Sequence, residues 1–232
     1  MNKLPIEVRV WDLPTRLFHW LLVASITTSV LTGFFDGILG ASTIDWHQRS
    51  GYLAIGLIAF RLVWGLVGGT YARFASFLKG PGAVLRSIRS LVGQGMSPEV
   101  PALGHTALGG WSLVAMLAAV ALQAVTGLFI SLEDYGFEAP LAKHVSRAVS
   151  DRMNAIHEWG VWVILALVAL HLGAILFYAI VKKTNLVTAM LSGFRRVPSV
   201  KPEDASQGGN IFLGLAVAGA VAYGVWWLVT KA

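Results

Sequence analysis

Apolar positions in this sequence fall into five long runs, and polar positions collect in the segments between them. Crossing about 30 Å of hydrocarbon takes about 20 helical residues, and each run is about that long. Lipid offers the backbone no hydrogen-bond partner, and runs without two-residue alternation are typical of helices rather than barrel strands. We therefore predict five membrane-spanning helices, at about 17–35, 47–69, 107–132, 157–181 and 211–229.

The composition also indicates a membrane protein. Of the 232 residues, 56% are hydrophobic and 13% are charged, whereas about 25% are charged in a typical soluble domain. The absence of cysteine excludes disulfides, a cysteine-ligated iron–sulfur cluster and the C-x-x-C-H attachment of a c-type haem. The net charge of +6 is not gathered with aromatic residues on a polar face, so we expect no nucleic-acid partner.

Lysine and arginine are distributed unequally between the segments that flank the runs. The N-terminal tail and the connections 70–104 and 182–210 together hold 12 of them, whereas the opposite side holds 5. Positive residues favour the cytoplasmic side, so the N-terminus is predicted to be cytoplasmic and the C-terminus to lie outside. The Pro-, Ser- and Gly-rich segment 197–210 is predicted to be a flexible linker between a core at 1–196 and the last helix within 211–232.

Two histidines, His157 and His171, lie inside the fourth run. Fourteen residues make about four helical turns, so both side chains lie on nearly the same face, about 21 Å apart along the axis. His47, at the start of the second run, lies at the predicted depth of His157. His19 in the first run is the best match for His171, although His105 at the start of the third run competes with it and spacing alone does not exclude it.

Two imidazole pairs at two depths suit two six-coordinate b-type haems stacked across the membrane. Bis-histidine ligation favours electron transfer over oxygen binding, and a haem can fill the space between four helices. We therefore predict an all-α membrane protein: a four-helix bundle that holds two haem b groups, with a fifth helix appended. The predicted metal ligands are His19, His47, His157 and His171, and His144 in the loop before the fourth run is expected to be exposed.

Arg61 is a second candidate site residue, because it lies inside the second run, 14 residues after His47. A guanidinium in hydrocarbon is costly and needs an anionic partner. A propionate of the cytoplasmic-side haem would supply one through a bidentate pair, and snorkelling toward the cytoplasmic headgroups is an equally weighted alternative.

Glycines within the runs are expected to let flat macrocycles approach the backbone, with ordinary small-residue helix packing as the competing interpretation. They are Gly33, Gly51, Gly56, Gly65, Gly127, Gly160 and Gly173.

The loop before the fourth run carries a predicted helical stretch from about 140 to 152. It places Lys143 and Arg147 four residues apart, with Arg152 one turn further on. Such a basic strip could dock an acidic redox partner or attract a small anion. The alternative is a solvated face that nearby acidic residues neutralise: Glu138, Asp151 and Glu158.

The sequence resembles the bacterial cytochrome b561 family, which includes the b-type cytochrome subunits of nickel–iron hydrogenases. The resemblance covers about residues 6–196 and rests on four segments: "VRVWDLPTRLFHW", "DWHQRSGYLAIGLIAFRLVWGLVGGTYARFASF", "GHTALGGWS…TGLF" and "IHEWGVWVILALVALHLGAILFYAIVKKTNLVTAMLSG". It implies that His19 and His171 ligate a cytoplasmic-side haem, and that His47 and His157 ligate a periplasmic-side one. The chain departs from the family at Thr106-Ala107, where an Asn-Pro is usual, and in the fifth helix.

The resemblance implies electron transfer in a bacterial inner membrane, between ubiquinone or menaquinone in the bilayer and a redox protein, most readily a periplasmic cytochrome or dehydrogenase. An enzymatic alternative is a superoxide oxidase, which some small relatives are, passing electrons from superoxide to quinone. A third class is a non-redox scaffold or transporter whose histidines carry protons; it predicts protein without haem absorbance.

Overall fold

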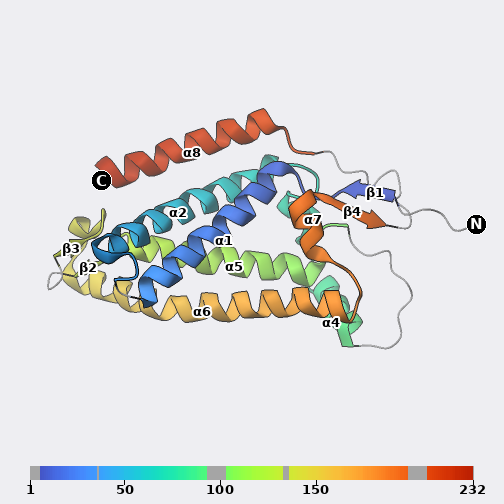
Figure 1. The fold of residues 1–232 in the computed structure, drawn as a ribbon, viewed down its shortest axis with the longest axis horizontal. Coiled ribbons are helices and arrows are strands. Elements are labelled where there is room, and N and C mark those ends of the chain that lie inside the picture. Colours follow the sequence, from blue (N-terminus) through green and yellow to red (C-terminus); the bar gives the residue numbers. More distant parts are fainter. Residues whose placement is uncertain (1–5, 36, 93–102, 133–135, 198–207, 232) are drawn as a thin grey trace, which may run out of the picture. The chain divides into compact units, whose positions relative to one another are not determined.

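A computed structural model of the protein describes residues 6–35, 37–92, 103–132, 136–197 and 208–231. Within these residues, five helices are long and apolar enough to cross a membrane. They are α1 (Leu13–Phe34), α2 (Thr43–Val67), α5 (Ala107–Gly127), α6 (Arg147–Ile180) and α8 (Ile211–Lys231), as Figure 1 shows. The predicted all-α membrane bundle with five spans is confirmed.

Shorter elements connect the long helices. The short helices are η1 (Gly40–Ser42), α3 (Phe74–Phe77), α4 (Pro81–Val92), η3 (Ala142–His144) and α7 (Leu186–Ser192). Strand β1 (Ile6–Arg9) pairs antiparallel with β4 (Phe194–Val197), with Ile6 opposite Val197, and the two arrows lie side by side in Figure 1. Strand β2 (Ser131–Leu132) pairs antiparallel with β3 (Phe137–Glu138).

Polar side chains next to the helix ends explain where several helices begin. Asp12 precedes α1 and its carboxylate accepts from the backbone N–H of Thr15 at 2.9 Å. Asn210 precedes α8 and accepts from the N–H of Phe212 at 2.9 Å. Both replace hydrogen bonds that the first turn of a helix cannot make internally. Helix α7 ends at Ser192 and is capped by Gly193, whose φ of 88° favours glycine.

The third span is shorter than predicted. Helix α5 ends at Gly127, and the prediction that it continues to 132 is wrong. The N–H groups of Leu128 and Phe129 bond to carbonyls three residues back, which tightens the chain into a turn. The carbonyl of Ile130 then accepts from the N–H of Ala139, so this apolar segment enters a hairpin instead of extending the helix.

The fourth span begins ten residues earlier than predicted, at Arg147. The predicted helical stretch at 140–152 is divided between η3 and the first turns of α6. Helix η3 stops at His144, and Val145 is extended with φ −127° and ψ 159°. Residues 147–156 are therefore the first turns of one 34-residue helix. At 1.5 Å per residue its length is about 51 Å, more than the hydrocarbon core requires.

The chain divides into two compact units. Unit 1 consists of Met1–Leu17, Leu62–Ala115 and Leu170–Leu215, and unit 2 of Phe18–Arg61, Met116–Ala169 and Ala216–Ala232.

In unit 1, the Asp12 carboxylate is buried and accepts from Trp64 Nε1 at 3.2 Å and from the N–H of Gly69 at 3.1 Å. The start of α1 is thereby hydrogen-bonded to the end of α2 and to the residues that follow it.

Helix α8 packs on α2 in unit 2 through a glycine. A Cβ at Gly56 would lie 3.6 Å from Val225 and 3.8 Å from Val221, which is ordinary van der Waals contact. Gly56 thus faces α8, and small-residue packing between two helices accounts for it. Most of the predicted linker 197–210 lies outside the described residues.

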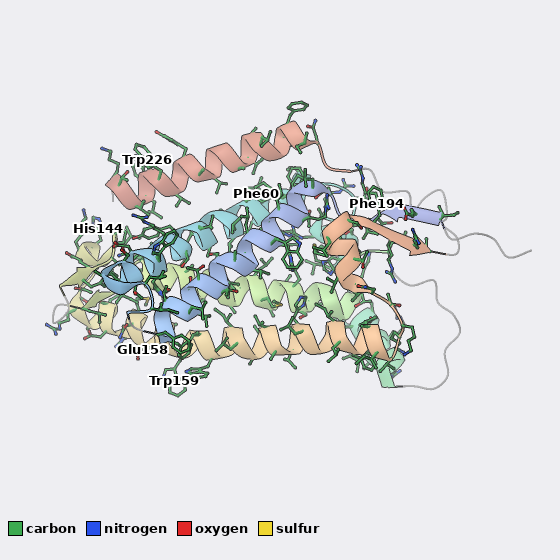
Figure 2. The ribbon with its side chains drawn as sticks, in the orientation of Figure 1. Phe60, His144, Glu158, Trp159, Phe194 and Trp226 are labelled. Carbon is green, nitrogen blue, oxygen red and sulfur yellow. The ribbon has the colours of Figure 1, made fainter. Side chains whose placement is uncertain are left out.

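Large apolar side chains stay exposed along the long helices. Trp159 of α6 is 74% exposed and projects away from its helix in Figure 2. Leu170 of the same helix is 69% exposed. Lipid, rather than water, is the solvent in which such surfaces are stable.

Candidate functional site

Two of the predicted ligands meet in unit 2. The imidazole of His47, from the first turns of α2, faces that of His157 from α6, with ring centroids 6.1 Å apart and planes inclined by 70°. Two imidazoles that grip one metal ion from opposite sides, each nitrogen about 2 Å from it, have ring centres about 6 Å apart. The spacing therefore suits a metal held between the two rings.

Each ring is held by hydrogen bonds that it donates to a neighbouring helix. His47 Nδ1 lies 3.0 Å from the carbonyl oxygen of Ser29 and 3.2 Å from Thr32 Oγ1, both on α1. His157 Nδ1 lies 2.9 Å from the carbonyl oxygen of Gln123 and 3.3 Å from Thr126 Oγ1, both on α5. The two histidines are oriented in the same way by two different helices.

These contacts fix which nitrogen of each ring carries the proton. A carbonyl oxygen can only accept, so Nδ1 of both His47 and His157 is the protonated, donating nitrogen. Nε2 is then left with a lone pair, which is the form in which imidazole binds a metal. A second hydrogen bond that orients the ligand in this way is the usual support of a metal-binding histidine.

Glycines provide the room for both rings. A Cβ at Gly127 would lie 3.0 Å from Cε1 of His157, and one at Gly33 would lie 3.2 Å from Cε1 of His47. Of the glycines singled out in the sequence, these two border the ligand candidates. Gly65 instead packs under Phe74, which is ordinary helix packing.

The other predicted site residues are distributed over both units. His19 lies on α1 in unit 2 and His171 on α6 in unit 1, both half-buried, and their pairing stays a prediction. Arg61 on α2 is 2% exposed.

His105 lies in unit 1 between the rings of Trp11 and Phe77, with centroids 4.8 and 5.1 Å away. His144 is exposed, as predicted, and is labelled in Figure 2.

The predicted basic strip has a different geometry from the one expected. Lys143 belongs to η3 and Arg147 begins α6, so the two do not follow one helical face. Both line a cavity of about 210 Å³ together with Glu138. A carboxylate among the lining residues lowers the positive charge around this cavity.

Sequence reasoning missed the residues that orient the two rings: Ser29, Thr32, Gln123 and Thr126. A signal for them exists, since "TGFF" at 32–35 and "TGLF" at 126–129 end the first and third apolar runs with nearly the same residues. Threonine and serine inside membrane helices usually bond to their own backbone, so these residues did not stand out as candidates.

Comparison with known proteins adds to this geometry. The sequence profile described as prokaryotic cytochrome b561 matches residues 10–193. A probable Ni/Fe-hydrogenase B-type cytochrome subunit of Rhizobium leguminosarum bv. viciae is 26% identical over 213 residues, covering 82% of this chain and 89% of that protein. The corresponding probable subunit of Azotobacter vinelandii is 24% identical over 221 residues, covering 84% and 91%. The probable Ni/Fe-hydrogenase 1 B-type cytochrome subunit of Escherichia coli K12 is 24% identical over 214 residues, covering 80% and 89%. No solved structure matches.

Proposed function

Because the chain belongs to the prokaryotic cytochrome b561 family, and so is a membrane b-type cytochrome of electron transfer, we propose that it holds two haem b groups. His47 and His157 ligate one, and His19 and His171 ligate the other. The observation that carries the proposal is the facing pair of His47 and His157, 6.1 Å between ring centroids.

The residues at this pair fit a haem. Both imidazoles present the unprotonated Nε2 that iron requires, because Nδ1 of each donates to a carbonyl. Haem b, when bound, supplies a one-electron Fe(III)/Fe(II) couple. The chain contributes ligation from two sides, a surrounding of apolar helices that excludes water, and fixed hydrogen bonds that orient both ligands.

The proposal of the second ligand pair is supported by the spacing of residues along the helices. His171 follows His157 by 14 residues on one continuous helix, α6, which gives a separation of about 21 Å along the axis. Arg61 follows His47 by the same 14 residues on α2 and is 2% exposed. Ionisable side chains inside membrane helices pair with opposite charges or with backbone carbonyls, and we assign Arg61 to a propionate of the haem that His19 and His171 hold.

The proposed electron path joins quinone in the bilayer to a redox protein. In the preferred orientation the N-terminus is cytoplasmic and the C-terminus periplasmic in a bacterial inner membrane, because basic residues favour the cytoplasmic side. His47 and His157 then lie on the periplasmic side. The relatives are named as hydrogenase subunits, and a periplasmic redox enzyme or cytochrome is the partner that this arrangement favours.

Superoxide oxidation is the weaker candidate. It needs an electropositive approach to the periplasmic-side haem, and the cavity that Lys143 and Arg147 line also contains Glu138. The carboxylate there offsets one of the two positive charges and weakens the attraction for a small anion, so we favour a protein partner.

Reduced-minus-oxidised spectra with haem quantitation test the proposal. We expect two b haems per chain in the wild type and one in each of four variants, His19→Ala, His47→Ala, His157→Ala and His171→Ala. The spectrum that remains should be the same for His47→Ala and His157→Ala, and different from the one shared by the other two.

Two histidines outside the proposed pairs serve as controls. His144→Ala and His105→Ala should keep both haems. A wild-type protein without haem absorbance would refute the proposal, and a haem lost with His105 but kept without His19 would refute the second pairing.

A further inference from the structure

We propose that Thr32 and Thr126 are a matched pair of positioning residues. Each fixes the ring plane and the proton of one ligand histidine, and together they set the reduction potential of the metal held between His47 and His157. This inference rests on the proposed ligation by those two histidines.

The two threonines occupy equivalent places in a repeated piece of structure. On α1, the carbonyl of Ser29, the hydroxyl of Thr32 and the bare backbone of Gly33 surround the ring of His47. On α5, the carbonyl of Gln123, the hydroxyl of Thr126 and the backbone of Gly127 surround the ring of His157 in the same order and at the same sequence spacing.

The carbonyl of each histidine also accepts a side-chain hydrogen bond, from its own helix in the case of His47 and from α5 in the case of His157. The carbonyl of His47 accepts from Ser50 Oγ at 2.9 Å, and that of His157 accepts from Gln123 Nε2, also at 2.9 Å. Ser50 and Gly160 both lie three residues after their histidine. Beside His47, Ser29 Oγ lies 2.7 Å from Ser50 Oγ. Beside His157, the longer Gln123 side chain covers Gly160.

The direction of the threonine hydrogen bonds follows from the helix backbone. Thr32 Oγ1 lies 2.7 Å from the carbonyl of Thr28, and Thr126 Oγ1 lies 2.9 Å from the carbonyl of Leu122. A hydroxyl has one proton, and in both cases a carbonyl one turn earlier receives it. The lone pair that remains on each Oγ1 accepts from Nδ1–H of the histidine.

Each imidazole N–H is thus shared between a carbonyl and a hydroxyl. Thr32 is 8% and Thr126 1% exposed, so water does not compete for these positions. An acceptor at Nδ1–H makes the imidazole a more basic ligand, which favours the oxidised, more positive iron. Two acceptors in different directions also fix the ring plane, and the two planes are inclined by 70°.

Conservative substitutions separate the hydroxyl from the shape of the side chain. Thr32→Val and Thr126→Val keep the branched shape and remove the acceptor, whereas Thr32→Ser and Thr126→Ser keep the hydroxyl. Thr27→Val is the matched control, because Thr27 is an exposed residue of the same helix α1.

Potentiometric titration of both haems in the purified full-length protein measures the effect. We expect each valine variant to raise the reduced-to-oxidised ratio of one haem about threefold at a fixed ambient potential, which is about 28 mV at 59 mV per tenfold. The other haem should not move, and Thr27→Val should titrate like the wild type. Both serine variants should restore the wild-type potential.

Electron paramagnetic resonance of the oxidised protein gives a second readout. Strongly inclined imidazole planes give a highly anisotropic low-spin signal, and the valine variants should change its largest g value while the serine variants keep it.

The outcomes distinguish the inference from the proposed function. Wild-type protein without a haem between His47 and His157 refutes the proposed function. Valine variants that keep this haem with the potential and g values of the Thr27→Val control refute the inference alone. Loss of the haem in a valine variant supports the inference if the serine variant retains it, and refutes it if the serine variant loses it too.

Discussion

Adding one methyl group at Gly127 should weaken the binding of the haem proposed between His47 and His157 enough to lower the haem content. A Cβ there would lie 3.0 Å from Cε1 of His157, whereas nonbonded carbons rest at about 3.5–4.0 Å. The ring of His157 in a Gly127→Ala variant must therefore move by about 0.5 Å or more. Metal–ligand distances tolerate about 0.2 Å, so the displacement exceeds what ligation allows.

The loss of haem binding should be larger for an alanine at Gly127 than for one at Gly33. At Gly33 the corresponding distance to His47 Cε1 is 3.2 Å, so the required movement is smaller, about 0.3 Å. Disturbing the support of a metal ligand typically weakens binding by about 10- to 100-fold, and we expect Gly127→Ala to fall in that range and Gly33→Ala below it. Gly219→Ala in α8 is the control, because a Cβ there meets nothing within 4 Å.

Haem content per chain, measured as the pyridine haemochrome with thermal unfolding in parallel, gives the assay. We expect close to one haem per chain in Gly127→Ala, an intermediate content in Gly33→Ala and two in Gly219→Ala. A Gly127→Ala protein that kept two haems with an unchanged spectrum would refute this reasoning, since the histidine would then have room that the structure does not show.

Three further predictions follow from other contacts. Asp12→Ala should lower the free energy of unfolding by about 3 kcal/mol, because it removes three acceptor bonds of one carboxylate, to Thr15, Trp64 and Gly69; a shift in the thermal midpoint no larger than that of Gly219→Ala would contradict it. Arg61→Gln should change the potential of the haem assigned to His19 and His171 and leave the other unchanged in a redox titration; equal shifts in both would argue against the propionate contact. Removing residues 208–232 should leave both haems bound, since the proposed ligands all precede α8, but should lower thermal stability; loss of either haem from the truncated protein would make α8 part of the haem-binding core.

The number and nature of the spans could be predicted because a membrane helix needs little more than length and apolar composition. The helix ends could not. Residues 128–132 are as apolar as the helix before them, but the backbone of Ile130 bonds to Ala139 and the chain turns. Residues 147–156 are mixed in polarity, yet they belong to the same continuous helix as the membrane segment.

The proximity of His47 and His157 could be predicted because the position of a residue along a membrane helix gives its depth in the bilayer, and these two depths match. The orientation of their rings could not, because it depends on which carbonyl of a neighbouring helix faces each Nδ1. Ser29 and Gln123 contribute backbone oxygens there. Every residue has a backbone oxygen, so the sequence does not indicate which one accepts the hydrogen bond. The β1–β4 pairing is similar: Ile6 and Val197 are far apart in sequence, and neither segment alternates over enough residues to indicate a strand.

The central claim is that one haem is shared by His47 and His157, and a double variant tests it most directly. His47→Ala, His157→Ala and the protein carrying both changes should each retain one haem per chain, with the same spectrum and the same midpoint potential, because all three lack the same group. A double variant with no haem, or single variants that keep two, would show that the two histidines do not grip a common iron.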